Sequence, residues 1–187
     1  WKDAGFNYLV WQIGFTPMGY GDGDENTLLY SGPATGNYRT YYFRKQINIT
    51  DTSIYPLGLF IKVKRDDGIL FYVNGIEVYR NNTIGLIPQY TDAAYSACPD
   101  DGNAWINIYI PTSLLIIGSN VFAAEIHQFE STAGDLSFDC IVEENFNSIC
   151  TRGPYLQTCT ENSVVVKWRT NVSTNSRVKI GNAYNVF

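Results

Sequence analysis

The sequence predicts an all-β protein: one complete β-sandwich followed by the first strands of a second one. Three observations support this fold class. Short segments in which apolar and polar residues alternate recur along the chain, and alternation is the pattern of half-buried strands. Turn-forming Gly, Pro and Asn residues separate these segments. No segment has apolar spacing that favours a long helix.

The strand predictions follow the chain in order. In 38–49, Tyr41, Phe43, Ile47 and Ile49 alternate with polar residues, which indicates one buried face. Asn74-Gly75 between two β-rich segments is the strongest short-range signal for a hairpin. The segment 1–27 reads as turn-rich, and 111–115 as a single helical turn. The strands expected in the first sandwich are Tyr38–Ile49, Leu57–Lys64, Ile69–Val73, Ile76–Tyr79, Trp105–Ile110, Val121–Gln128 and Leu136–Val142.

The polar segment 143–150 interrupts the strand pattern, so we place the domain boundary there, with domains 1–147 and 148–187. Beyond it, new strands are expected at Gly153–Leu156, Val164–Trp168 and Arg177–Ile180. Three strands cannot close a sandwich, so the second domain is expected to be incomplete within this chain.

Composition and charge exclude several function classes. The net charge is −5 and there is no cluster of Lys and Arg, which argues against a nucleic-acid partner. No apolar stretch is long enough to predict a transmembrane segment. Aromatic residues make up 15% of the chain, a content that suits β-surfaces and contacts with sugars or proteins.

Cysteines and glycosylation sequons favour a secreted or cell-surface protein. Four cysteines without a CxxC pair fit two disulfides of undetermined pairing, and the alternative is that some are free, buried thiols, Cys140 above all. Cys98 is the candidate for pinning the long loop 81–103. Sequons suggest glycans on outward strand ends. The disulfide candidates are Cys98, Cys140, Cys150 and Cys159, and the glycosylation candidates are Asn48, Asn81 and Asn171.

Five blocks, in order, resemble the galactose-binding-like jelly-roll modules of large secreted proteins: Gly19–Gly23, Tyr41–Lys45, Asp66–Val78, Gly118–Gln128 and Asp135–Asp139. The resemblance covers about residues 1–147 and implies a jelly-roll sandwich that binds a glycan. Three further blocks, Arg152–Gln157, Val164–Thr170 and Ser176–Gly181, resemble the start of the fibronectin-III-like domain that precedes the catalytic domain of purple acid phosphatases. That family's metal-binding blocks lie in a domain that this chain does not include.

Asp22, Asp24 and Glu25 lie in a Gly-rich loop and are candidate ligands for calcium, because Ca²⁺ prefers carboxylate and carbonyl oxygens presented by bent loops. The jelly-roll resemblance supports a structural calcium, since such modules often hold one. The alternative is a solvated turn.

Candidate ligand-binding residues come from loops and from one strand. Aromatic platforms with a few fixed polar groups suit sugar binding, and the loops offer Tyr20, Tyr90, Tyr95 and Trp105. Glu125 and His127 share a strand face, and they would form a polar cluster with Asp135 and Asp139 if the two strands were neighbours. Packing under loops and an ordinary polar face are the respective alternatives.

No nucleophile elbow, P-loop or dinucleotide fingerprint is present, and the chain has one histidine. We interpret Asp66-Asp67-Gly68 as a tight turn and not as a catalytic carboxylate pair. The leading hypothesis is therefore a non-catalytic extracellular binding module for a glycan or a neighbouring protein domain. The alternatives are a structural building block of an extracellular filament, matrix or adhesin, and the N-terminal region of a secreted metallophosphoesterase.

Overall fold

The computed structural model describes residues 1–34, 36–56, 58–143 and 150–170. The chain divides into two compact units, Trp1–Asn145 and Phe146–Phe187. Strands account for 46% of the described residues and helices for 4%, so the predicted all-β fold class is confirmed.

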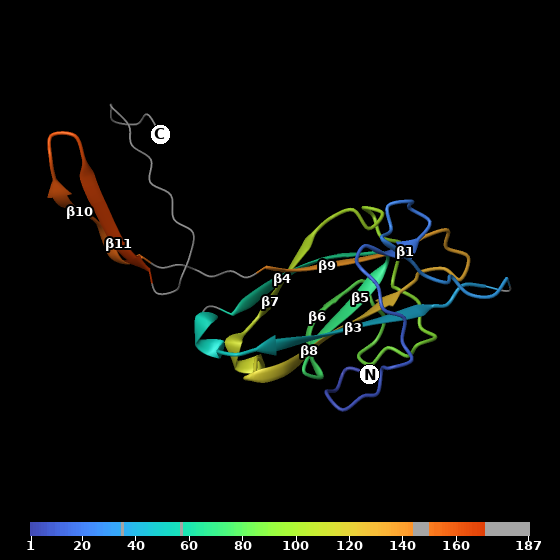
Figure 1. Ribbon diagram of the computed structural model, residues 1–187. Helices are drawn as coiled ribbons and strands as arrows, with labels where there is room; N and C mark the ends of the chain where they lie inside the picture. The colour runs from blue at the N-terminus through green and yellow to red at the C-terminus, as the bar shows by residue number, and fades with distance from the viewer. Residues whose placement is uncertain (35, 57, 144–149, 171–187) are drawn as a thin grey trace. The chain divides into compact units, whose positions relative to one another are not determined.

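The first unit is a sandwich of two sheets (Figure 1). One sheet has the strand order β2-β1-β9-β4-β7 and the other has the order β3-β8-β5-β6. Every pair in these sheets is antiparallel except β1 with β2, which is parallel. The strands are β1 (Met18–Tyr20), β2 (Thr27–Leu28), β3 (Thr40–Ile49), β4 (Leu59–Arg65), β5 (Gly68–Val73), β6 (Ile76–Asn81), β7 (Ile106–Ile110), β8 (Gly118–His127) and β9 (Leu136–Glu143).

Alternating side chains of both sheets meet in one hydrophobic core. In β4, Leu59, Ile61 and Val63 are buried, while the residues between them are half-exposed. Phe43 of one sheet stacks on Phe138 of the other with ring centroids 4.2 Å apart. The period-2 pattern in the sequence is therefore the pattern of a strand with one face in a sandwich core.

The hairpin predicted at Asn74-Gly75 joins β5 to β6. Both turn residues have positive φ, 50° and 83°, as the favoured two-residue turn requires. Asn74 also donates to Asn120 Oδ1 at 2.9 Å and accepts from the Val121 N–H at 2.9 Å. A single turn, η2 (Thr112–Leu114), confirms the expected helical turn; another, η1 (Thr52–Ile54), follows β3.

The first 28 residues hold two short strands that the sequence did not predict, β1 and β2. Gly19 pairs with Ser137 of β9, and a Cβ at Gly19 would overlap the backbone carbonyl oxygen of Leu136. Gly21 has φ +102°, and a Cβ there would lie 2.7 Å from the Asp135 Cα. Two glycines thus let this segment lie directly against β9.

Hydrogen bonds to a buried carboxylate hold the loop 81–103 in place. Asp67 Oδ1 accepts from the Cys98 N–H at 2.6 Å, and Asp67 Oδ2 accepts from the Phe129 N–H at 2.7 Å. The Cys98 thiol lies 2.8 Å from Arg65 Nη1 and donates to Asp100 Oδ1 at 2.9 Å. Cys98 therefore helps to hold the loop in place, and it does so through hydrogen bonds and not through a disulfide.

The predicted disulfides are not borne out for the cysteines whose side chains are described. Cys98, Cys140 and Cys159 are free thiols. Cys140 is free, as the alternative expected, but it is only partly buried, and Cys98 is the buried thiol. Desolvation raises the pKa of the Cys140 thiol to about 12, which makes it unreactive as a nucleophile near neutral pH.

The second unit contains a hairpin of β10 (Cys150–Cys159) and β11 (Val164–Thr170). The two strands pair antiparallel with several register shifts. The strand predicted at Arg177–Ile180 and the sequon at Asn171 lie outside the described residues.

Candidate ligand and cation site

One end of the first unit carries an acidic cavity of about 270 Å³. The loop between β1 and β2, the loop before β7 and the strand β9 each contribute carboxylates, and β4 contributes one lysine. The cavity is lined by Pro17, Asp22, Asp24, Lys64, Asp101, Gly102, Asn103, Ser137, Phe138 and Asp139.

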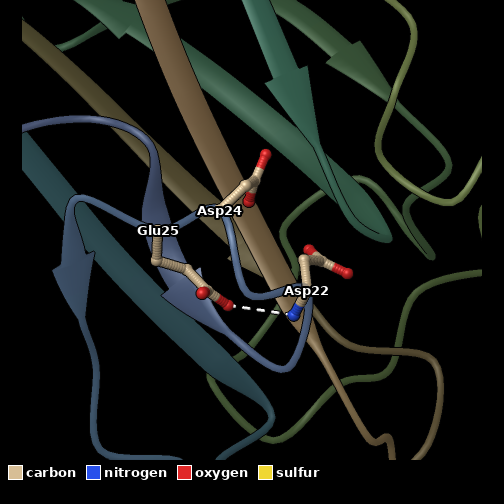
Figure 2. Close-up of side chains that lie close together, drawn as sticks. All are labelled: Asp22, Asp24 and Glu25. Atoms are coloured by element: carbon tan, nitrogen blue, oxygen red, sulfur yellow. Dashed lines mark hydrogen bonds between the residues drawn. The ribbon is translucent and has the colours of Figure 1, made fainter.

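The Glu25 carboxylate forms hydrogen bonds with the backbone of its own glycine-rich loop. One oxygen of this carboxylate accepts from the Asp22 N–H at 3.0 Å, and the other accepts from the Gly23 N–H at 3.0 Å. Figure 2 shows the Glu25 side chain turned back toward the Asp22 backbone. Backbone N–H groups, first its own and then those of Asp22 and Gly23, lower the pKa of Glu25. Glu25 therefore shapes the loop.

Asp22 lies at the junction of two carboxylate groups. It is close to Asp24 and Glu25 on its own loop, and also to Asp101 and Asp135 from other loops. Within each group of three, one oxygen of each carboxylate lies within 4.8 Å of the others. The Ser137 hydroxyl donates to Asp22 Oδ2 at 2.6 Å, which orients this carboxylate. Partial burial and then the negative charges of Asp22, Asp101 and Asp67 raise the pKa of Asp135.

Asp66 and Asp67 form a buried carboxylate pair near this cavity, with 7% and 6% of their surfaces exposed. The turn predicted for Asp66-Asp67-Gly68 is present, but its carboxylates face the protein interior. Asp67 keeps two backbone N–H partners, while burial and the neighbouring charge of Asp67 raise the pKa of Asp66 to about 8. Asp66 is thus suited to hold a proton at neutral pH.

The carboxylates in and beside the cavity fit a hard cation. Ca²⁺ takes six to eight oxygen ligands, and it relieves the repulsion between carboxylates that lie this close. Asp22, Asp101 and Asp135 come from three separate loops, so a cation among them would join those loops. Because both oxygens of Glu25 already accept hydrogen bonds from the loop backbone, we favour Asp22, Asp101 and Asp135 over the predicted Asp22, Asp24 and Glu25.

The four predicted aromatic platforms do not share one site. Tyr20 is buried, and its hydroxyl accepts from Gln128 Nε2 at 2.7 Å, so it is a core residue. Tyr90 and Tyr95 are 70% and 75% exposed on the loop 81–103. Trp105 is 40% exposed, and the ammonium group of Lys64 lies 5.2 Å from the centre of its ring. Trp105 does not itself line the acidic cavity, but its ring lies beside Lys64, which does.

The predicted cluster of Glu125 and His127 with Asp135 and Asp139 does not form, because β8 and β9 belong to different sheets. Glu125 accepts from the Tyr72 hydroxyl at 2.6 Å and lies 3.8 Å from His127 Nε2. His127 Nδ1 contacts the Asp92 carbonyl oxygen at 2.9 Å. Both side chains are buried, so this pair is a structural polar cluster and not an open ligand site.

The two sequons in the described residues differ in accessibility. Asn48 is exposed near the end of β3, so it is a suitable acceptor for a glycan. Asn81 is only partly exposed, and its Oδ1 accepts from Arg65 Nη2 at 3.0 Å.

Sequence reasoning missed Asp101, Asn103 and Ser137 as part of this site. A local signal existed, since Asp100-Asp101-Gly102-Asn103 is an acidic glycine turn of the same kind as 22–25. What the sequence lacks is any indication that two such turns, about 80 residues apart, lie together.

No family model and no curated protein matches this chain. Among the described residues, no helix is both long enough and apolar enough to cross a bilayer.

Proposed function

We propose that this chain is a non-catalytic, extracellular carbohydrate-binding module whose ligand site is the acidic cavity, with a calcium ion joining its loops. The observation that carries the proposal is a polar cavity lined by carboxylate, amide and hydroxyl groups, with a half-exposed tryptophan in contact with one lining residue, Lys64. Sugars are recognised by such polar groups together with an aromatic platform. The resemblance of residues 1–147 to galactose-binding-like modules supports the same ligand class.

The role of the cation follows from the placement of the carboxylates. Asp22, Asp101 and Asp135 carry three negative charges within a small volume, so their repulsion opposes closure of the three loops. Ca²⁺ would replace this repulsion with shared coordination, and its remaining positions suit hydroxyl or water oxygens. Asp22, Asp101 and Asp135 would hold the ion, while Asp139, Asn103 and Ser137 line the cavity beside it.

Calcium is expected to stabilise the folded chain. At a Ca²⁺ concentration of about 100 times Kd, the gain is about 2.7 kcal/mol, which corresponds to a rise in Tm of roughly 5–10 °C for a chain of this size. Asp101→Asn should abolish most of this rise, because it removes one ligand charge while Asn tolerates the positive φ of 53° at this position. Differential scanning calorimetry in calcium and in EDTA measures both effects.

The matched control is Glu130→Gln, which removes one negative charge from an exposed residue that does not line the cavity. Its response to calcium should equal that of the wild type. A Tm that is the same in calcium and in EDTA would reject the cation site. The proposal of glycan binding would then be decided separately by the glycan array.

Glycan binding is expected to depend on Trp105. A glycan array probed with the 187-residue chain in calcium should identify a bound saccharide, and Trp105→Ala should weaken that binding about tenfold or more, because stacking on an aromatic face is lost. Tyr90→Ala is the control, since Tyr90 is exposed but does not line the cavity. Binding that survives Trp105→Ala and Asp139→Asn, or an array without any bound glycan, would contradict this function.

A structural module is the second candidate, favoured by one observation. Leu9, Val10, Ile13 and Phe15 are each more than 80% exposed within one short segment. Exposed apolar side chains that lie close together are typical of contact surfaces between proteins. A neighbouring extracellular domain would be the corresponding partner.

A further inference from the structure

The strand β3 has a free edge. It pairs only with β8, and it stands at the end of the strand order β3-β8-β5-β6. Just before β3, the Arg39 carbonyl oxygen accepts from the Gln128 N–H at 2.8 Å. This bond shows which residues of β3 face β8 with their backbone groups, because every second residue of an antiparallel strand does so. Odd-numbered residues of β3 therefore bond to β8, and even-numbered residues direct their N–H and C=O groups away from it. Among the described residues, no hydrogen bond reaches those outward groups of Tyr42, Arg44, Gln46 and Asn48.

A free strand edge is a template for pairing with another strand, and β3 is ten residues long. A hollow of about 150 Å³ lies beside its N-terminal half, lined by Trp11, Gln12, Met18, Leu29, Tyr41, Tyr42 and Phe43. The edge therefore offers unpaired backbone groups together with a mostly apolar hollow for a side chain of an added strand.

Two basic residues occupy the middle of this edge. Lys45 lies on the same strand face as the core residue Phe43, yet its side chain is exposed, and no carboxylate pairs with it among the described residues. Arg44 lies on the opposite face and donates to the Trp1 carbonyl oxygen at 2.6 Å and the Asp3 carbonyl oxygen at 2.8 Å. An inward-pointing lysine on an edge strand is a known means of preventing edge-to-edge association.

The geometry of symmetric pairing shows which partners these charges exclude. In an antiparallel pair of two β3 strands, opposite residues must share a face, so even-numbered residues oppose even-numbered ones and odd oppose odd. The two most central registers place Lys45 opposite Lys45 or Arg44 opposite Arg44. Like charges directly opposite each other destabilise a strand pair, so a second copy is repelled in either register.

We propose that the free edge of β3 is a strand-addition site. Lys45 prevents a second copy of this chain from pairing with the edge, and the edge binds an extended segment that carries a carboxylate opposite Lys45. The backbone groups of the edge supply the hydrogen bonds of the added strand. The unpaired ammonium group of Lys45 selects the added strand by its charge, because a carboxylate opposite Lys45 is attracted where a second lysine is repelled.

A charge swap tests the proposal with the chain itself as the probe. Lys45→Glu provides an edge with a carboxylate at the selecting position, and because Lys45 is exposed, the substitution leaves the core packing unchanged. Wild type alone and Lys45→Glu alone should each remain monomeric, because each opposes like charges. Their equimolar mixture should form a complex of two chains, seen by sedimentation velocity and native mass spectrometry, that dissociates at high salt.

The control is Lys62→Glu, which makes the same charge change on β4, a strand with neighbours on both sides. Its mixture with wild type should remain monomeric, and circular dichroism should show native β-structure for both variants. A mixture of wild type and Lys45→Glu that stays monomeric would overturn the proposal. Equal association of Lys62→Glu with wild type would overturn it as well, because the pairing would then not depend on the edge.

Discussion

Gly19→Ala should lower the free energy of unfolding by about 3 kcal/mol or more, because the added Cβ would overlap the carbonyl oxygen of Leu136 in the neighbouring strand. The obstacle is backbone, so no side-chain rotation can relieve it, and β1 must separate from β9. For a chain of this size, the corresponding fall in Tm is roughly 6–12 °C. Urea denaturation followed by tryptophan fluorescence measures the change.

Gly134→Ala is the matched control for this prediction. Gly134 lies just before β9, and no atom lies within 4 Å of the position a Cβ would occupy. We expect its stability to stay within about 1 kcal/mol of the wild type. Equal stability of the two variants would show that the close approach of β1 to β9 does not exist as described. Gly19→Ala should also lose the response to calcium, since the same approach places Asp22 beside Asp135.

The second large effect is a fall in stability as the pH rises from about 4 to 8. Burial and the adjacent charge of Asp67 raise the pKa of Asp66 from 3.8 to about 8 in the folded chain. Between these two values the folded state holds a proton that the unfolded state has released. The stabilisation is therefore complete below pH 4 and is lost as the pH rises through the folded-state pKa, with a slope of at most about 1.4 kcal/mol per pH unit.

Asp66→Asn should flatten this pH profile, because a neutral amide needs no proton. Near pH 4 the variant and the wild type should have similar free energies of unfolding, and the variant should become relatively more stable toward pH 8. Urea denaturation in EDTA at several pH values measures the difference without a contribution from bound cations. Glu130→Gln, at an exposed position, should keep the wild-type slope. Parallel profiles for wild type and Asp66→Asn would refute the assignment.

The strand pattern could be predicted because its cause is local. Alternating residues such as Leu59, Ile61 and Val63 face the core on one side, and the side-chain period of a strand reveals that face without knowledge of its partner. The Asn74-Gly75 turn is equally local, since two consecutive positive φ angles favour those residues. The short strands β1 and β2 escaped prediction, because Gly19 and Gly21 read as turn residues when the strand against which they pack is distant in sequence.

For the candidate site, the sequence alone identified one loop with candidate oxygen ligands, because Asp22, Asp24 and Glu25 stand in a glycine-rich turn. The tertiary structure decided how they are used. Glu25 accepts hydrogen bonds from its own loop, while Asp22 meets Asp101 and Asp135. It also separated Glu125 and His127 from β9 by placing the strands in different sheets. The physical reason is the same in each case: turns and alternation depend on neighbouring residues, whereas sheet order brings together groups whose spacing along the chain carries no information about their distance.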